Sequence, residues 1–457
     1  MKVVIGKMEI MLILQMILAA TIAAVMYTII GAAPGADETA TIAPITLVLV
    51  LSGLEPAVIL AFFIAAIVSC KLIDSVPVSV AGIPAGVMST PMVEHAMVLK
   101  KHGLTDTSIR KIASGAVIGT IVSIPVSLFL AKALIPFANV IKDYGNVAFF
   151  VGAILLALMS KHKWISLAAI LPFTLLIQGM RFLYWEIGAV PEGTTVSTSF
   201  FLAITIGPVL LTLFELLNKD KRNGMKHYDK KTINLKGSYD AGKFPNPLKI
   251  LTKKEIGYSI ITSLIGCITF ILSPVGLTVF FGELFASREK DEVKKASLAV
   301  TIMEALAQST YMAGILIPLI ALGIPLSPVA IGPGNPLFNA EPVFNLEHNM
   351  HHLLSMGDYL WATILGAGIA ATFTFFVAVK YSRQICTFVF KKIPHEAFLG
   401  LFVSLVLLLA FMDGGFINVI GVLLIGIVAG TLYRLGVSYG VLFMILYSAP
   451  WIVQTIL

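Results

Sequence analysis

The sequence predicts an all-α polytopic membrane protein built from two structural repeats with broken or re-entrant helices. The first observation behind this prediction is composition, because 58% of the 457 residues are apolar and 12% are charged. A soluble domain is roughly 45–50% apolar, and the mean hydropathy of this chain is +0.93. The second observation is a series of long apolar runs. The third is a pair of helix breaks that recurs in register in two halves of the chain.

Long apolar runs extend from one end of the chain to the other. Each approaches or exceeds the roughly 18–20 residues that cross the hydrocarbon core of a bilayer. The runs cover residues 8–31, 111–134, 143–160, 197–217, 357–380, 395–412, 416–434 and 437–455. Together with shorter returning segments, they predict about 10–12 membrane crossings. The first run exceeds the roughly 7–15 residues of a signal-peptide core, so we expect an uncleaved first helix.

Proline and glycine interrupt the apolar sequence at matching places in the two halves. A break at Pro34 in the first half has a counterpart at Pro274 in the second half. Each break is followed by a Gly-Ile-Pro triplet, so that Pro34 and Pro84 are 50 residues apart and Pro274 and Pro325 are 51 residues apart. A lone Pro-Gly pair in a membrane helix is more often a simple kink. Breakers that recur in register instead predict a duplicated protein with discontinuous helices.

A hydrophilic linker over residues 218–255 separates a first repeat, 1–217, from a second repeat, 256–457. The linker has eleven basic and four acidic side chains, so its net charge of +7 equals that of the whole chain. A basic stretch between membrane spans is typical of a cytoplasmic loop, and we expect no nucleic-acid partner. Arg181, near the outer side, is an exception to this charge pattern. The loop charges favour a parallel duplication and leave an inverted pair open.

The breaks are the predicted binding site for a small-molecule substrate. Proline removes a backbone donor, and glycine lets the backbone approach a ligand closely. Unpaired backbone groups in hydrocarbon cost several kcal/mol each, so they persist only where protein or water surrounds them. The candidate substrate-binding residues are Pro34, Gly35, Ala36, Thr39, Gly82, Pro84, Ala85, Gly86, Ser273, Pro274, Gly276, Thr278, Gly323, Pro325 and Ser327.

Acidic residues within apolar sequence are the candidate ion-coupling residues, because a charge in the bilayer costs at least about 2.5–3.5 kcal/mol. These candidates are Asp37, Glu38, Asp74 and Glu304, together with Gln308. The first two have an alternative role as caps of the returning helix. Asp74 also has an alternative role, as the neutralising partner of a lysine three residues earlier. We expect no intramembrane arginine or lysine to match this set of carboxylates, which indicates Na⁺ or H⁺ coupling or a cationic substrate.

Other features favour packing or exposure over a site. The spacing of three histidines, His348, His351 and His352, would place their side chains on one face of a helix, as in a metal site. Their place in an outer loop favours exposure to solvent instead. Gly426 and Gly430 have the spacing of close helix packing. The three cysteines are isolated and form no CxxC pair, which argues against a disulfide or zinc site. Without a Walker motif, we expect no ATP hydrolysis.

Several motifs resemble the large permease subunit of tripartite tricarboxylate transporters. That family opens with a Gly-x-x-Pro-Gly break, and this chain has Gly-Ala-Ala-Pro-Gly-Ala at 31–36. Its second signature resembles Gly-Ile-Pro-Ala-Gly at 82–86. In the second half, Met-Glu-Ala-Leu-Ala-Gln at 303–308 and Gly-Ile-Leu-Ile-Pro-Leu-Ile-Ala-Leu-Gly-Ile-Pro at 314–325 are similar to its Pro-Glu-Ala-Ala-Asn-Asn and Gly-x-Leu-Ile-Pro-x-x-x-Leu-Gly-Ile-Pro-Gly. The resemblance covers roughly residues 10–420.

The resemblance implies a secondary active transporter that moves a small carboxylate across the prokaryotic cytoplasmic membrane. Glu304 matches the family's glutamate, and Gln308 stands where the family has paired asparagines. An extracytoplasmic solute-binding protein and a small membrane subunit are the implied partners, in addition to membrane lipid. We expect alternating access with Na⁺ or H⁺ as the coupling ion and no cofactor.

Other functions stay open beside that expectation. One is transport of a cationic or other small metabolite without binding-protein partners, and others are a channel and a membrane-embedded enzyme. Nothing in the chain is spaced like a known catalytic motif, so an enzyme is the weakest of these alternatives. The sequence indicates no oligomeric state.

Overall fold

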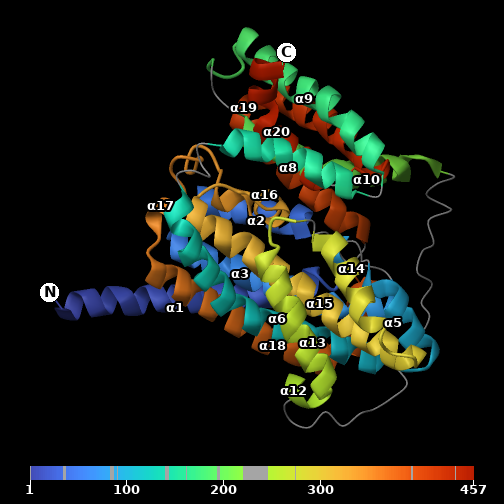
Figure 1. Cartoon of the computed structure of the whole chain (residues 1–457). Helices are drawn as coiled ribbons and strands as arrows, with labels where there is room; N and C mark the ends of the chain where they lie inside the picture. Colours follow the sequence, from blue (N-terminus) through green and yellow to red (C-terminus); the bar gives the residue numbers. More distant parts are fainter. Residues whose placement is uncertain are drawn as a thin grey trace.

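In the computed structural model, the chain folds into helices joined by short turns (Figure 1). The structure describes residues 2–33, 38–82, 87–89, 91–138, 144–160, 162–192, 196–219, 245–272, 274–392, 395–437 and 439–456. The elements before the linker are α1 (Lys2–Ile30), α2 (Glu38–Leu51), α3 (Pro56–Ile73), α4 (Ser75–Ala81), η1 (Val87–Ser89), α5 (Met92–Lys101), α6 (Thr105–Leu134), η2 (Ile135–Phe137), α8 (Gly145–Met159), α9 (Lys163–Glu186) and α10 (Ser197–Leu217). Those after it are α12 (Pro247–Ile250), α13 (Lys253–Ile268), α14 (Pro274–Ala286), α15 (Glu292–Ile317), η3 (Pro318–Leu322), α16 (Pro328–Ile331), η4 (Asn335–Leu337), α17 (Met350–Leu353), α18 (Met356–Lys392), α19 (His395–Arg434) and α20 (Tyr439–Ile456).

Eight helices in the described part of the chain are long and apolar enough to cross a membrane. They lie in α1, α3 with α4, α6, α9, α10, α15 with η3, α18 and α19, and shorter apolar helices lie in α2, α8, α14 and α20. A helix satisfies its own backbone hydrogen bonds, which is why it can reside in lipid. The predicted all-α, multi-pass membrane fold is therefore confirmed.

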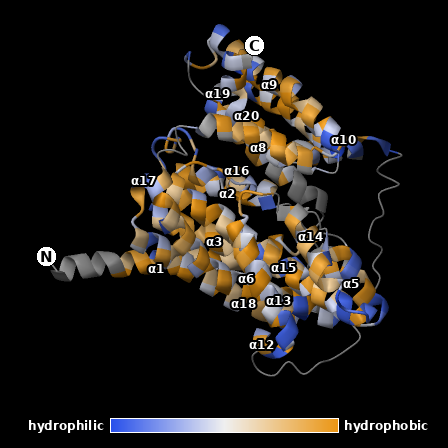
Figure 2. Ribbon diagram, in the orientation of Figure 1, coloured by the Kyte–Doolittle hydropathy of each residue, from blue (hydrophilic) through white to orange (hydrophobic). Residues whose placement is uncertain are grey.

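The long helices form two groups. In the upper part of Figure 1, α8, α9, α10, α19 and α20 pack together, and we call these helices the upper group. The lower group consists of α1, α3, α6, α13, α15 and α18. Figure 2 shows apolar residues along the helices of both groups and hydrophilic residues at α12. Each group takes helices from both sides of the linker, so neither group coincides with a predicted repeat, and the repeat boundaries stay a prediction.

Two helices, α3 and α15, lie at the centre of the lower group. Every residue from Ala57 to Ile73 and from Leu298 to Ile317 is buried. Pro56 suits the first turn of α3, and the side chain of Asp291 caps α15 by accepting a hydrogen bond from the Lys294 amide at 2.8 Å. A helix that is apolar on all sides is one that its neighbours enclose. A polar side chain on either helix therefore faces protein.

Glycines allow the closest helix crossings in both groups. A Cβ atom added at Gly115 or Gly119 of α6 would lie 2.3 Å or 2.5 Å from a backbone carbonyl oxygen of α15. In the upper group, a Cβ atom at Gly430 would lie 2.4 Å from the carbonyl oxygen of Gly207 on α10. Small residues at such crossings let two helix backbones approach each other. The predicted packing role of Gly426 and Gly430 is confirmed, since the Cβ position of Gly207 lies 2.5 Å from the Gly426 carbonyl.

The predicted helix breaks are present where the structure describes them. Gly82 and Gly323, which open the two Gly-Ile-Pro triplets, have φ angles of +70° and +67°. Each directly follows a helical segment, and its amide donates to the carbonyl of Val78 or Pro318, respectively. Glycine adopts this left-handed conformation without strain. The two triplets therefore end helices in the same way.

The third break begins and ends earlier than predicted. α13 ends at Ile268 and α14 begins at Pro274, so Gly276 and Thr278 belong to α14 and not to the break itself. The fixed φ of proline suits the first turn of a helix, which explains this start. Eight of the predicted substrate- and ion-binding residues lie outside the described residues, namely Pro34, Gly35, Ala36, Asp37, Pro84, Ala85, Gly86 and Ser273.

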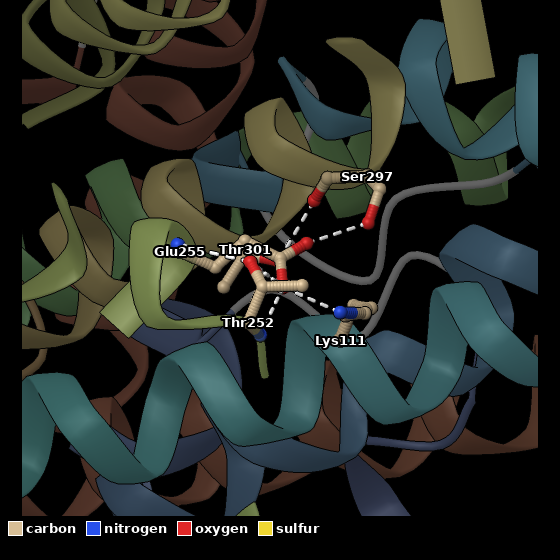
Figure 3. A network of polar contacts seen from close by, with 5 residues as sticks. All are labelled: Lys111, Thr252, Glu255, Ser297 and Thr301. Atoms are coloured by element: carbon tan, nitrogen blue, oxygen red, sulfur yellow. Dashed lines mark hydrogen bonds and ion pairs between the residues drawn. The ribbon is translucent and has the colours of Figure 1, made fainter. Parts of the chain in front are cut away.

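A polar network joins α6, α13 and α15 beside the linker (Figure 3). Glu255, which precedes the apolar part of α13, accepts hydrogen bonds from Lys111 Nζ at 2.5 Å, Ser297 Oγ at 2.7 Å and the Thr252 amide at 2.7 Å. Thr301 Oγ1 donates to the Ser297 carbonyl at 2.8 Å. Burial alone would raise the pKa of Glu255, but these hydrogen bonds and the charge of Lys111 outweigh it and lower the pKa. The carboxylate therefore stays ionised at neutral pH and holds three helix ends together.

Candidate functional site

The broken segments of the two halves meet in pairs. α2 contacts η4, and the Cβ position of Gly332 lies 3.4 Å from Oγ1 of Thr39, so the first break adjoins the loop that follows the fourth. η1 contacts both α14 and α15, so the second break adjoins the third. Each pair therefore combines one segment from before the linker with one from after it.

The first of these pairs lies between the upper and lower groups of helices. α2 contacts α10 and α19, and α16 contacts α20. Figure 1 shows α2 and α16 between α3 below and α8 above. Non-helical backbone at membrane depth is tolerated where protein or water covers it. The boundary between the two groups is therefore the place where a solute would meet the broken segments.

A buried charge cluster lies beside the first break. Lys71, near the end of α3, forms an ion pair with Glu38, the first residue of α2, and donates to Asp74 Oδ2 at 3.2 Å. Its ammonium also lies 5.1 Å from the ring centre of Tyr311 on α15, a cation–π contact. The side chains of Lys71, Glu38 and Asp74 are at most 2% exposed. The cluster thus connects α2, α3 and α15 deep inside the protein.

The expectation that no intramembrane lysine matches the carboxylates was wrong. Lys71 is fully buried and lies among them, because α3 continues past it into the core and leaves its side chain no path to water. The predicted pairing of Asp74 with this lysine is present, and Glu38 pairs with it as well. A lone lysine in an apolar helix was the signal in the sequence, but only the fold brings Glu38 to it.

α15 presents a polar face toward this cluster. Glu304, Gln308 and Tyr311 have the i, i+4, i+7 spacing that places residues on one side of a helix. The charges of Lys71, Asp74 and Glu38 all act on Glu304. Glu304 and Gln308 are 0% exposed. Neither carboxylate oxygen of Glu304 and neither amide atom of Gln308 forms a hydrogen bond within the described residues.

Unpaired buried groups of this kind are rare. More than nine in ten buried polar groups have a hydrogen-bond partner, and leaving one unpaired costs about 1–3 kcal/mol or more. Two adjacent side chains with four unpaired atoms are therefore equipped to bind something else. Oxygen atoms from a carboxylate and an amide suit a proton or a hard cation.

Four further predicted residues, Ser327, Pro325, Thr39 and Thr278, are buried near the breaks, and Gly82 is half-buried. Ser327 Oγ donates to the Gly314 carbonyl at 2.5 Å and accepts from the Ala330 amide at 2.9 Å, so this hydroxyl caps α16 and ties it to α15. Pro325 is buried beside it, and Thr39 and Thr278 are buried in α2 and α14. The structure thus places Thr39 beside Gly332 of the loop after the fourth break, and Thr278 in the helix that contacts η1 of the second break.

A further polar cluster in the upper group was missed from the sequence. Gly414 and Gly415 have non-helical backbone angles inside α19, so this helix consists of two segments. At the break, Ser199 of α10 donates to the Asp413 carboxylate, and Asn418 donates to Ser199 Oγ at 2.8 Å. The signal was an Asp-Gly-Gly sequence in the middle of apolar residues, because glycine pairs permit a kink and a buried aspartate needs hydrogen-bond donors, here Ser199 and Asn418.

The histidines near α17 take part in local contacts. His351 Nδ1 lies 3.1 Å from the Leu319 carbonyl oxygen, and His352 Nδ1 accepts from the Asn349 amide at 3.3 Å. Among the residues that the structure describes, no group of three or more His, Cys, Asp or Glu side chains is placed to hold a metal ion.

Comparison with protein families decides the class of this protein. The model of the tripartite tricarboxylate transporter TctA family matches residues 17–444, which is nearly the whole chain. The chain belongs to the TctA family. It is therefore a multi-pass membrane protein of a transporter family, and the resemblance found in the motifs is confirmed. A comparison with curated proteins and one with solved structures gave no match.

Proposed function

We propose that this TctA-family chain is a secondary active permease that moves a small carboxylate across the cytoplasmic membrane by alternating access. A proton or Na⁺ is the coupling ion. The observation that carries this proposal is the pair Glu304 and Gln308, which is wholly buried, forms no side-chain hydrogen bond with any described residue, and is adjacent to the Lys71 cluster. Ionisable groups inside a membrane domain mark ion and substrate pathways.

Charge balance supports coupling to a cation. Three carboxylates, Glu38, Asp74 and Glu304, act on one ammonium, that of Lys71. Fully ionised, the set has an excess of two negative charges, and an unpaired buried charge is strongly unfavourable. A proton on Glu304, or a Na⁺ bound by the oxygens of Glu304 and Gln308, reduces this excess. Loss of the cation on one side of the membrane would then change the charge of the core.

The position of the breaks supports alternating access. In discontinuous-helix transporters, substrate binds at unwound segments near the bilayer midplane, and one bundle rocks against the other. Here α2 and α16 lie where the lower group meets the upper group. Movement of one group relative to the other would open this boundary first to one side and then to the other. As in the tripartite systems that name the family, an extracytoplasmic binding protein and a small membrane subunit would serve as partners.

Uptake into proteoliposomes tests the proposal. The purified chain is reconstituted, and uptake of radiolabelled citrate and succinate is measured with an inward Na⁺ gradient, with an inward proton gradient and with neither. We expect concentrative uptake with one of the two gradients. Equal flux without a gradient would indicate a channel, and uptake of labelled cations in place of carboxylates would indicate a cationic substrate.

Glu304→Gln tests the proposed coupling residue. The amide keeps the shape of the side chain, but it takes up no proton and has no negative charge to attract a cation. We therefore expect concentrative uptake to fall at least tenfold, while the yield of folded protein stays the same. Glu292→Gln is the matched control, because Glu292 begins the same helix and is exposed to solvent. Wild-type uptake by Glu304→Gln would remove this residue from the mechanism.

A further inference from the structure

Arg181 is a buried cation that lies outside the Lys71 cluster. It lies in the last third of α9 and is 3% exposed. Its guanidinium donates to Gln178 Oε1 at 3.2 Å, to Ser197 Oγ at 2.9 Å and to the Leu446 carbonyl at 3.4 Å. All three partners are neutral. They come from α9, α10 and α20, so the side chain points into the upper group.

The charge of Arg181 lacks an ion-pair partner in the described structure. None of the ion pairs formed between described residues includes it, although the charge of Glu341 acts on it from farther away. Its Nε atom is buried and forms no hydrogen bond within the described residues. Buried arginines are almost always paired with a carboxylate or phosphate. An uncompensated guanidinium with a free donor is therefore prepared for an anion.

Arg181 also lies where the upper group meets the broken segments. Its acceptor Leu446 precedes Tyr447, whose hydroxyl accepts a hydrogen bond from Asn335 of η4. η4 contacts α2, which carries Glu38 of the charge cluster. The Oδ1 atom of Asn335 is buried and forms no hydrogen bond within the described residues. Tyr447 and Asn335 thus lie between the helix that accepts from Arg181 and the segment next to the first break.

We infer that Arg181 binds a carboxylate group of the transported substrate from the side of the upper group. This inference rests on the proposed function and names a residue that binds its substrate. Arginine suits this role because its planar fork donates two parallel hydrogen bonds to a carboxylate and its charge is permanent. Tyr447 and Asn335 then lie beside the bound substrate, while Glu304 and Gln308 on α15 hold the coupling cation. The anion and the cation thereby occupy opposite sides of the broken segments.

A purely structural role is the alternative, since three hydrogen bonds from Arg181 join three helices. The two roles predict different effects on ligand binding. A residue that only joins helices affects all ligands alike, whereas a residue that binds a carboxylate distinguishes an acid from its neutral amide. The test therefore compares a carboxylic acid with its monoamide, which has the same shape and one negative charge fewer.

Binding to the purified full-length chain in nanodiscs is measured by titration with citrate, succinate and the monoamide of each. We expect the wild type to bind at least one acid, and to bind it at least tenfold more tightly than its monoamide. Arg181→Gln should weaken binding of the acid at least tenfold and bring the acid-to-amide ratio close to one. Arg181→Lys keeps the charge without the fork and should give intermediate affinity. Arg434→Gln is the matched control, because that arginine is partly exposed and pairs with Glu215 at the surface.

The possible outcomes separate this inference from the proposed function. A folded Arg181→Gln variant with the wild-type acid-to-amide ratio would overturn the role of Arg181 and leave carboxylate transport intact. Should that variant fail to fold, an unchanged affinity of Arg181→Lys for the acid would overturn the role equally. A wild type that neither binds nor transports any of the acids would overturn both. Loss of acid discrimination in Arg181→Gln, with the control unchanged, supports the inference.

Discussion

Lys71 is the only charged residue of α3, and the surrounding structure explains how the protein tolerates it. Its ammonium has Glu38 and Asp74 as ion-pair partners and the ring of Tyr311 as a cation–π partner. Burial removes the hydration of all these charges, so each depends on the others for stabilisation. Removing any one of these buried charges therefore destabilises the charges beside it.

Lys71→Met tests this dependence. The substitution leaves Glu38 and Asp74 without their counter-charge, and breaking a buried pair in this way costs about 3–5 kcal/mol. We expect a corresponding loss in the free energy of unfolding, measured by denaturant titration of the purified chain in detergent. The double variant Lys71→Met/Glu38→Gln should recover part of the loss, because it removes one of the two uncompensated carboxylates.

The control for this experiment is Lys132→Met, which removes an exposed lysine from α6. Its stability should stay within about 0.5 kcal/mol of the wild type, as expected for a surface substitution. Equal stability of Lys71→Met and Lys132→Met would show that the cluster contributes nothing to the fold.

At the scale of elements, glycines let two helices of the lower group cross closely. α6 and α15 approach until the carbonyl oxygens of α15 lie within 2.5 Å of the Cβ positions of two glycines. This crossing holds the middle of α15 against α6, at the level of Glu304 and Gln308, since Gly119 also faces the Cβ of Gln308 at 3.0 Å. The position of Glu304 and Gln308, the proposed ion-coupling residues, therefore depends on the small size of these two glycines.

Gly115→Ala tests the crossing. A methyl group there would lie 2.3 Å from the Thr301 carbonyl, so the helices must separate, and overpacking of this kind costs about 1–3 kcal/mol. We expect a lower midpoint of thermal unfolding. Gly368→Ala in α18 is the matched control, because a Cβ atom at Gly368 has no neighbour within 4 Å. The control should be neutral or slightly stabilising, since alanine favours a helix by about 1 kcal/mol over glycine. Equal unfolding midpoints of Gly115→Ala and Gly368→Ala would contradict the close approach of α6 and α15.

On the scale of the whole molecule, two helix groups enclose segments from both halves of the chain. The hydrogen bond from Asn335 to Tyr447 joins η4, which lies between the groups, to α20 of the upper group, and Gly334 beside η4 packs against Ile315 of α15 in the lower group. When one rigid group rotates against another about their interface, the contacts at that interface are rearranged. The proposed transport cycle requires that this boundary change.

A cross-link across the boundary tests that requirement. In a background without the native cysteines, Asn335→Cys/Tyr447→Cys is treated with a bifunctional thiol reagent that reduction cleaves. We expect carboxylate uptake to stop on cross-linking and to return to its earlier rate on reduction, because a fixed boundary prevents alternating access. Because both positions lie beside the proposed substrate site, the control is the same double variant treated with a monofunctional thiol reagent, which should keep more of its uptake than the cross-linked protein. Undiminished uptake by the cross-linked protein would contradict movement of one group against the other.

Much of the fold follows from local chemistry and is therefore readable in the sequence. Apolar runs of membrane length determine the helices, and glycine at the two Gly-Ile-Pro triplets ends them through left-handed backbone that other residues avoid. Glu304 was recognisable as a carboxylate placed in the middle of an apolar helix. These features depend only on residues near one another in the chain.

The partners of each charge were decided by the tertiary structure. Glu38 reaches Lys71, Arg181 turns inward toward Ser197 and Leu446, and Asp413 meets Ser199, although long stretches of sequence separate the members of each pair. Such pairing depends on how helices pack, and packing is set by the shapes of whole helix faces. The sequence by itself determined that this chain is a helical membrane protein with interrupted spans, whereas only the packed helices determined which buried charges lack a partner.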